Sequence, residues 1–340
     1  MSTCMNRVIL FSLTALVLLI SCKPNRTERI DPTNVPASIQ LERFEQDLFS
    51  ASPDSLQTLV PELRKKYGRF VDLFSEGIIH IGKTDSPEYC NYLSQFLSDT
   101  MVQNAYRLSQ QKFQNISSIK VCLNEAFNRF HCYFPDKPVP KIYTFVSGYN
   151  LSLAVDDSIL AIGLDRYLGS NTVQYKLLGI PRYQVRNMRP EKIPSDAIRA
   201  WMYGSFSFHD STDNLLSNLI YEGQVMYLTK QMLPQESDSL IFGFTPSQHR
   251  WCLKNEKAMW TNLIENKLLF STNTLDINKF INDAPFTSGF PQESPGRAAV
   301  WIGYRIVESL MKNNDTLTLS EMMGISDYQK FLAMSRYKPR

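Results

Sequence analysis

The segment NLLSNLIYEGQVMYLTKQMLP, residues 214–234, constrains the fold of this chain more than any other part of the sequence. On a helical wheel at about 100° per residue, its apolar side chains cover nearly the whole circumference. A surface helix of a globular protein carries one apolar stripe, whereas a helix that is apolar all round is buried. We therefore expect a central helix over about 213–233 that the rest of the chain surrounds.

Part of this segment, IYEGQVMY, resembles the H-E-x-x-H helix of zinc peptidases, in which two histidines bind the metal and the glutamate is the general base. Glu222 matches the glutamate, but Tyr221 and Val225 stand where the histidines would be. Valine cannot bind a metal and a neutral phenol binds zinc poorly, so we predict no metal and no other cofactor. Glu222 is then the one candidate for a catalytic base. The alternative that we favour is a buried carboxylate, which needs a partner.

Charged residues on two later expected helices supply candidate partners and a candidate third metal ligand. Glu256 follows Glu222 by 256 − 222 = 34 residues, a separation at which some zinc peptidases place a third ligand. Arg297 is expected in the first turn of its helix, where the helix dipole disfavours a cation. We therefore hypothesise that Arg297 or Arg305 pairs with Glu222 or Glu256 inside the core. The alternatives are a surface position for Glu256 and Arg–Glu pairing along the helix surface.

The N-terminus has the pattern of a bacterial lipoprotein signal. Arg7 precedes VILFSLTALVLLI, an apolar run of 13 residues that is too short for a comfortable transmembrane helix. The run ends in LISC, a Leu-x-small-Cys pattern that resembles a lipobox. We expect cleavage before Cys22 and acylation of that residue, with a plain secretory signal as the alternative. Two or three acyl chains would hold the protein on a membrane surface.

The signal predicts that the mature chain lies outside the cytoplasm, and a content of 43% hydrophobic and 20% charged residues indicates a globular protein. Residues 22–38 are polar, contain proline and lack periodicity, as is typical of a flexible tether. The formal net charge of +3 is dispersed along the chain, which argues against a nucleic-acid partner.

The remaining cysteines are Cys90, Cys122, Cys132 and Cys252. An oxidising compartment permits disulfides, and four cysteines allow three connectivities. Cys122 and Cys132 share one expected helix and lie about 15 Å apart at the helical rise, which is too far to bridge. Four buried free thiols are the interpretation that we favour slightly, and disulfides between the other pairs stay open.

Hydrophobic periodicity predicts an α+β fold, mostly helical with a small central antiparallel sheet. Residues 39–340 form one expected domain, divided into a helical part at 39–135 and an α+β part at 136–340. Strands are expected at Ile142–Ser147, Leu151–Val155 and Ile159–Gly163, and further helices near 194–207, 246–270, 295–313 and 320–335. Ser117 and Ser118 are expected to cap one helix and Asp213 to cap the central one.

Ordered blocks along residues 39–340 resemble the gliding motility lipoprotein GldB family of Bacteroidota. The blocks are LERFEQDLF, PKIYTFVSGYNLS, ILAIGLDRYLG, LGIPRYQVRNMRPEKIPSDAI, LLSNLIYEGQVMYLTKQMLP, NEKAMWTNLIENKLLFST, PGRAAVWIGYRIVESLMKNN and SRYKP. The resemblance implies a zincin-like architecture, similar to a degenerate metallopeptidase, in the part at 136–340. It also implies a lipoprotein that faces the periplasm on the outer membrane and accompanies a machine for gliding and secretion. It supplies no catalytic residues to carry over.

Three functional hypotheses follow from the sequence. The first is a non-catalytic, lipid-anchored envelope protein that contacts gliding or secretion proteins or peptidoglycan. The second is a hydrolase of peptides or cell-wall material that uses Glu222, with Glu256 and an unrecognised metal. The third is a periplasmic module that binds a peptide in a cleft of the zincin-like part.

Overall fold

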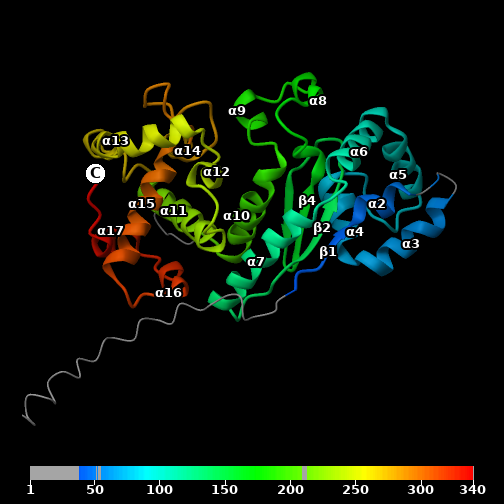
Figure 1. Cartoon of the computed structure of the whole chain (residues 1–340), viewed down its shortest axis with the longest axis horizontal. Coiled ribbons are helices and arrows are strands. Elements are labelled where there is room, and N and C mark those ends of the chain that lie inside the picture. The colour runs from blue at the N-terminus through cyan, green and yellow to red at the C-terminus, as the bar shows by residue number, and fades with distance from the viewer. Residues whose placement is uncertain (1–37, 51, 53–54, 209–212, 340) are drawn as a thin grey trace, which may run out of the picture.

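The structure is a computed structural model that describes residues 38–50, 52, 55–208 and 213–339 (Figure 1). It is mostly helical and contains a small four-stranded sheet, so the predicted α+β class is confirmed. The strands are β1 (Leu41–Arg43), β2 (Lys141–Phe145), β3 (Leu153–Asp156) and β4 (Ile159–Gly163), in the order β1-β2-β4-β3.

The sheet is mixed, so the expectation of an antiparallel sheet was wrong. The predicted hairpin is present, because β3 and β4 pair antiparallel with Val155 opposite Leu160. However, β3 takes the edge of the sheet, so β4 lies beside β2 and runs parallel to it. The strand β1 also pairs parallel with β2, with Glu42 opposite Tyr143. Its three residues are too few to show a period of two, which is why the sequence predicted no strand there.

The sheet is covered by helices on both faces (Figure 1). Tyr143 and Phe145 of β2 pack into an aromatic cluster with Phe44, Phe70 and Phe74 from the N-terminal helices. The alternate residue Ile142, with Leu160 and Ile162 of β4, packs into the larger core of the later helices. The two parts that the sequence separates at residue 135 therefore share one sheet. The helices up to this sheet are α2 (Phe44–Phe49), α3 (Leu56–Tyr67), α4 (Arg69–Asp72), a π-helical turn (Leu73–Ile78), α5 (Tyr89–Ser98), α6 (Thr100–Lys112) and α7 (Ser117–Tyr133).

The helices that follow the sheet build the larger core. They are α8 (Val173–Leu177), α9 (Arg182–Val185), α10 (Ile193–Ser205), α11 (Leu215–Met232), α12 (Asp238–Phe242), α13 (Pro246–Glu265), α14 (Thr274–Ile281), α15 (Ala298–Asn313), α16 (Leu319–Met323) and α17 (Tyr328–Ser335). The single helix expected near 320–335 is thus two helices, and the one expected near 246–270 ends at Glu265. Short 3₁₀ turns lie at Leu164–Arg166 and Pro190–Lys192.

The central helix of the prediction is α11, and no residue of it is exposed. It packs against α7, α10, α14, α15 and α17. Its closest neighbour is α15, which it meets at a pair of glycines. A Cβ on Gly223 would lie 2.1 Å from the carbonyl carbon of Gly303, so the two backbones touch with no side chain between them. Glycine is the one residue that permits this approach.

Three of the expected helix starts were wrong. Asn214 caps α11 in a capping box with Ser217, and Asp213 precedes the cap with a positive φ of 37°. Ser117 already belongs to α7, and the Asn115 side chain accepts its backbone N–H at 2.8 Å. Arg297 is the cap residue of α15 in a left-handed conformation, with φ 53°, and does not lie in the first turn.

Two findings concern expectations from the N-terminus and the cysteines. Among the described residues, no helix is long and apolar enough to cross a membrane. Cys22 and the segments 1–21 and 22–37 lie outside the described residues. The thiols of Cys90, Cys122, Cys132 and Cys252 are free in the structure, but Cys252 alone among these four is buried and the other three are half-buried.

Candidate functional site

The two positions where a zinc peptidase would hold its histidines have other roles on α11. The hydroxyl of Tyr221 donates a hydrogen bond to the carbonyl oxygen of Phe206 at 2.7 Å. Burial, and after it the charge of Glu222, raises the pKa of Tyr221 to about 12, so the phenol stays protonated at neutral pH. The side chain of Val225 is fully buried in the core. Tyr221 is thus a protonated hydrogen-bond donor and Val225 a packing residue of the core.

Glu222 is engaged by two side chains from neighbouring elements. The hydroxyl of Tyr203 on α10 donates to its carboxylate at 2.6 Å. The guanidinium of Arg297 lies 3.6 Å away, between Nη2 and Oε2. Burial, followed by the charge of Glu222, raises the pKa of Tyr203 well above its usual value, so Tyr203 remains the donor. Glu222 therefore has one hydrogen-bond donor and one cation beside it, which are the kinds of partner that a largely buried carboxylate needs.

Glu256 meets the other arginine of the hypothesis. Its side chain, on α13, is 1% exposed and accepts a hydrogen bond from Nε of Arg305 at 3.1 Å. The hydroxyl of Tyr337, which follows α17, donates to its second oxygen at 3.0 Å. Arg305 also pairs with Glu308 one turn further along α15. The structure thus brings Arg297 to Glu222 and Arg305 to Glu256, as two separate pairs.

Among the described residues, the two glutamates of the hydrolase hypothesis do not meet in one site. Glu222 and Glu256 are engaged by different partners, and Glu256 has no part in the contacts of Glu222. Within residues 38–50, 52, 55–208 and 213–339, no three side chains of His, Cys, Asp or Glu are grouped closely enough to hold a metal ion.

A cavity of about 260 Å³ lies on the other side of Arg297. It is bordered by β3, α9 and α10 on one side, and by the end of α12 and the loop between α14 and α15 on the other. Its polar lining comprises Ser152, Arg166, Tyr167, Tyr183, Gln184, Arg186, Asn187, Lys192, Asp196, Arg199, Asp283 and Arg297. Because Arg297 also contacts Glu222, this cavity adjoins the position that the sequence singled out.

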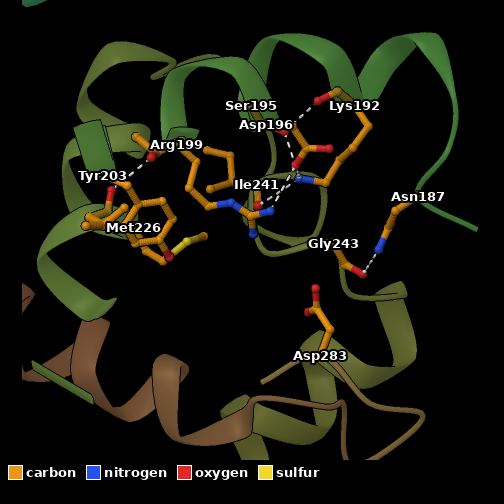
Figure 2. A network of polar contacts seen from close by, with 12 residues as sticks. Asn187, Lys192, Ser195, Asp196, Arg199, Tyr203, Met226, Ile241, Gly243 and Asp283 are labelled. Atoms are coloured by element: carbon orange, nitrogen blue, oxygen red, sulfur yellow. Dashed lines mark hydrogen bonds and ion pairs between the residues drawn. The ribbon is translucent and has the colours of Figure 1, made fainter. Parts of the chain in front are cut away.

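One wall of the cavity is a buried ionic network (Figure 2). Nζ of Lys192 lies 2.8 Å from Oδ1 of Asp196 and donates to Oγ of Ser195 at 2.9 Å and to the carbonyl of Ile241 at 3.2 Å. Arg199 approaches the same Oδ1 of Asp196 at 3.4 Å. Burial lowers the pKa of Lys192 to about 8, although Asp196 opposes that change. Lys192 thus forms an ion pair with Asp196, whereas Nε of Arg186 and Nε of Arg297 have no hydrogen-bond partner among the described residues.

The family of the chain follows from its sequence. A family model for the gliding motility protein GldB matches residues 25–339, nearly the whole chain. The chain belongs to the GldB family. No curated protein and no solved structure matches it. The resemblance on which the sequence interpretation relied is therefore confirmed, and the roles of particular side chains in this GldB-family chain rest on its own geometry.

Sequence reasoning missed the cavity of this GldB-family chain, although one signal was present. RYQVRNMRP carries Arg182, Arg186 and Arg189 without an acidic residue among them. Aromatic residues together with these arginines suggest an RNA contact, which the extracytoplasmic location expected from the N-terminal signal disfavours. In the structure Arg186 lines the cavity, and its Nη2 donates a hydrogen bond to the carbonyl oxygen of Gly243 at 3.0 Å. Arginines without acidic neighbours were the available hint of an anion site, but nothing local in the sequence shows that Lys192, Arg199 and Arg297 join them.

Proposed function

We propose that this chain is a lipid-anchored, non-catalytic protein of the cell envelope that acts by binding components of the gliding motility or secretion machinery. Membership of the GldB family supports the association with gliding motility. The observation that carries the non-catalytic role is the engagement of Glu222 by Tyr203 and Arg297, beside a protonated Tyr221 and a packed Val225. We place the protein on the periplasmic face of the outer membrane, through lipid on Cys22.

In this proposal the part at 136–340 is a zincin-like scaffold that has lost its metal site. The long buried helix α11 carries its glutamate in the place of a peptidase base. Arg297 supplies next to that glutamate the positive charge that a metal would bring. A guanidinium is a cation without an open coordination position, so it keeps the helix packing but activates no water.

The lipid anchor is tested by Cys22→Ala. We expect the variant to leave the membrane fraction, because removal of two or three acyl chains removes the main source of membrane affinity. The measurement is fractionation of cells followed by detection of the chain, with a Cys252→Ala variant as the control that keeps the lipobox. A Cys22→Ala protein that stayed with the membranes would count against acylation at this residue.

The non-catalytic role is tested by Glu222→Gln in a strain that lacks the wild-type chain. The amide can still accept the Tyr203 hydroxyl, so we expect a loss of about 1–2 kcal/mol in the free energy of unfolding and retained colony spreading and secretion. Removal of a true general base would instead lower turnover by roughly 10²–10⁴-fold. A stable Glu222→Gln protein that failed to support function would favour the peptidase or cell-wall hydrolase. The direct readout is then hydrolysis of peptides or peptidoglycan by the purified wild-type chain.

A further inference from the structure

The cavity beside Arg297 carries an excess of positive charge. Its lining contains five basic and two acidic side chains, which leaves 5 − 2 = 3 positive charges, and Glu222 beyond Arg297 reduces the excess to two. The basic residues are Arg166, Arg186, Lys192, Arg199 and Arg297. Like charges gathered around a partly enclosed space repel one another and concentrate anions there. The cavity therefore favours an anionic occupant with about two negative charges.

Two of these arginines keep buried donors that no described residue satisfies. The side chain of Arg297 is 7% exposed, and its Nε has no hydrogen-bond partner among the described residues. Nε of Arg186 is also buried and has no hydrogen-bond partner among the described residues. Buried polar groups are nearly always hydrogen-bonded in folded proteins, so each of these unpaired Nε atoms requires an explanation. A ligand in the cavity with several acceptor oxygens would accept hydrogen bonds from both Nε atoms and so explain why neither has a partner in the protein.

Of the two acidic residues that line the cavity, Asp283 is the one whose side chain is exposed to solvent. Its side chain is 62% exposed, and its Oδ1 lies 3.7 Å from Nη1 of Arg297. Figure 2 shows it pointing toward the network of Lys192, Asp196 and Arg199 from the opposite side. An exposed carboxylate loses little when it turns away into solvent. We interpret it as an internal anion that partly neutralises the arginines and moves aside for a ligand.

We propose that this cavity binds a phosphate group, with Arg186 and Arg297 donating hydrogen bonds to its oxygens and Asp283 competing for the same charge. A phosphate monoester carries about −1.5 to −2 charges and three strong acceptors, which matches an excess of two charges and several free donors. The planar fork of arginine suits oxyanions of this shape. A cavity of about 260 Å³ lies below the usual range for drug-sized ligands, which indicates a compact group.

This inference goes beyond the proposed function, because an envelope protein without catalysis does not need a phosphate site. The phosphate site and the proposed function are tested by separate experiments, so one can be wrong while the other holds. Phosphate binding is measured on the purified chain, whereas the anchor and the role of Glu222 are measured in cells.

The test is calorimetric titration of the purified full-length chain in a neutral detergent at low salt. Inorganic phosphate is the first probe, and we expect a dissociation constant of about 1 mM or tighter. Arg186→Gln removes one charged donor and should weaken binding at least tenfold, while a melting curve verifies that the variant is folded. Asp283→Asn removes the competing anion and should tighten binding several-fold. Arg182→Gln is the matched control, because Arg182 is an exposed arginine of the same segment outside the cavity.

Further probes identify the source of the phosphate. Glycerol 3-phosphate represents a soluble ester, and micelles doped with phosphatidic acid represent a lipid headgroup. The source is identified by the probe, among these three, that binds most tightly and whose binding depends on Arg186 in the same way. Acetate carries one charge and should bind at least tenfold more weakly.

Three results would overturn the proposal. One is the absence of heat or displacement with every phosphate probe up to about 10 mM. Another is equal weakening by Arg186→Gln and Arg182→Gln, which indicates unspecific attraction. The third is acetate binding as tight as phosphate binding.

Discussion

Gly303→Ala is expected to lower the free energy of unfolding by more than about 3 kcal/mol, a large part of the usual stability of a folded domain. An added Cβ would lie 1.6 Å from the carbonyl oxygen of Leu219 on α11. The obstacle is backbone, so no side-chain rotation can relieve the clash. The two central helices would have to separate along their whole contact.

The sign of this effect is opposite to that of helix propensity. Alanine in a helix interior is ordinarily more favourable than glycine by about 1 kcal/mol, so an isolated α15 would gain from the same change. Gly324→Ala provides the control, because its Cβ would meet the nearest atom at an ordinary 3.4 Å. We expect that variant to stay within about 0.5 kcal/mol of the wild type.

The measurement is denaturant unfolding of the purified chain, followed by circular dichroism. A Gly303→Ala protein as stable as the wild type would mean that the helices do not cross at Gly223 and Gly303.

The sequence predicted the buried helix but not how it packs. Apolar side chains around the whole of 214–234 were sufficient to place α11 at the centre, because burial depends on the side chains of that segment alone. The crossing with α15 depends on Gly223 and Gly303, which lie 303 − 223 = 80 residues apart. A glycine in the middle of a helix signals a close approach, but it does not name the partner.

The sheet shows the same limit. The sequence located β2, β3 and β4 to within about two residues, since short runs of β-branched, aromatic and other apolar residues between turn residues indicate a strand locally. Strand order depends on pairings across the chain, so the parallel neighbours β2 and β4 were not predictable from a hairpin pattern. Helix starts were also missed, because serine and aspartate are acceptable caps at several adjacent positions.

The candidate site divides in a similar way. That Tyr221 and Val225 stand where a zinc peptidase has histidines was visible in the sequence, because it depends on residue identity at fixed helical spacing. Which arginine meets which glutamate was not, and the hypothesis left four combinations open. The structure selects two of them. The cavity was not predicted, because only the arginines of residues 182–189 hinted at it, and its other basic residues come from segments between residues 166 and 297 that show no common pattern.

Arg305→Met is expected to lower the free energy of unfolding by about 3–5 kcal/mol. The change keeps most of the volume but leaves the Glu256 carboxylate, 1% exposed, with the Tyr337 hydroxyl as its one remaining side-chain hydrogen-bond donor among the described residues. A buried anion without a cation is costly, whereas the pair in the wild type is close to balanced. Glu256→Gln in the same background removes the charge and should recover part of the loss, which a double-mutant cycle measures.

Glu308→Gln is the matched control, because it removes the other carboxylate that Arg305 contacts. That side chain is 42% exposed, so solvent screens the pair, and we expect a loss below about 1 kcal/mol. The sequence left open whether Arg305 serves a buried or a surface pair, and these two variants distinguish the cases. Equal losses would indicate that Arg305 acts only along the surface of α15. A large loss for Arg305→Met alone would show that Glu256 joins α13, α15 and the segment after α17 through one buried charge.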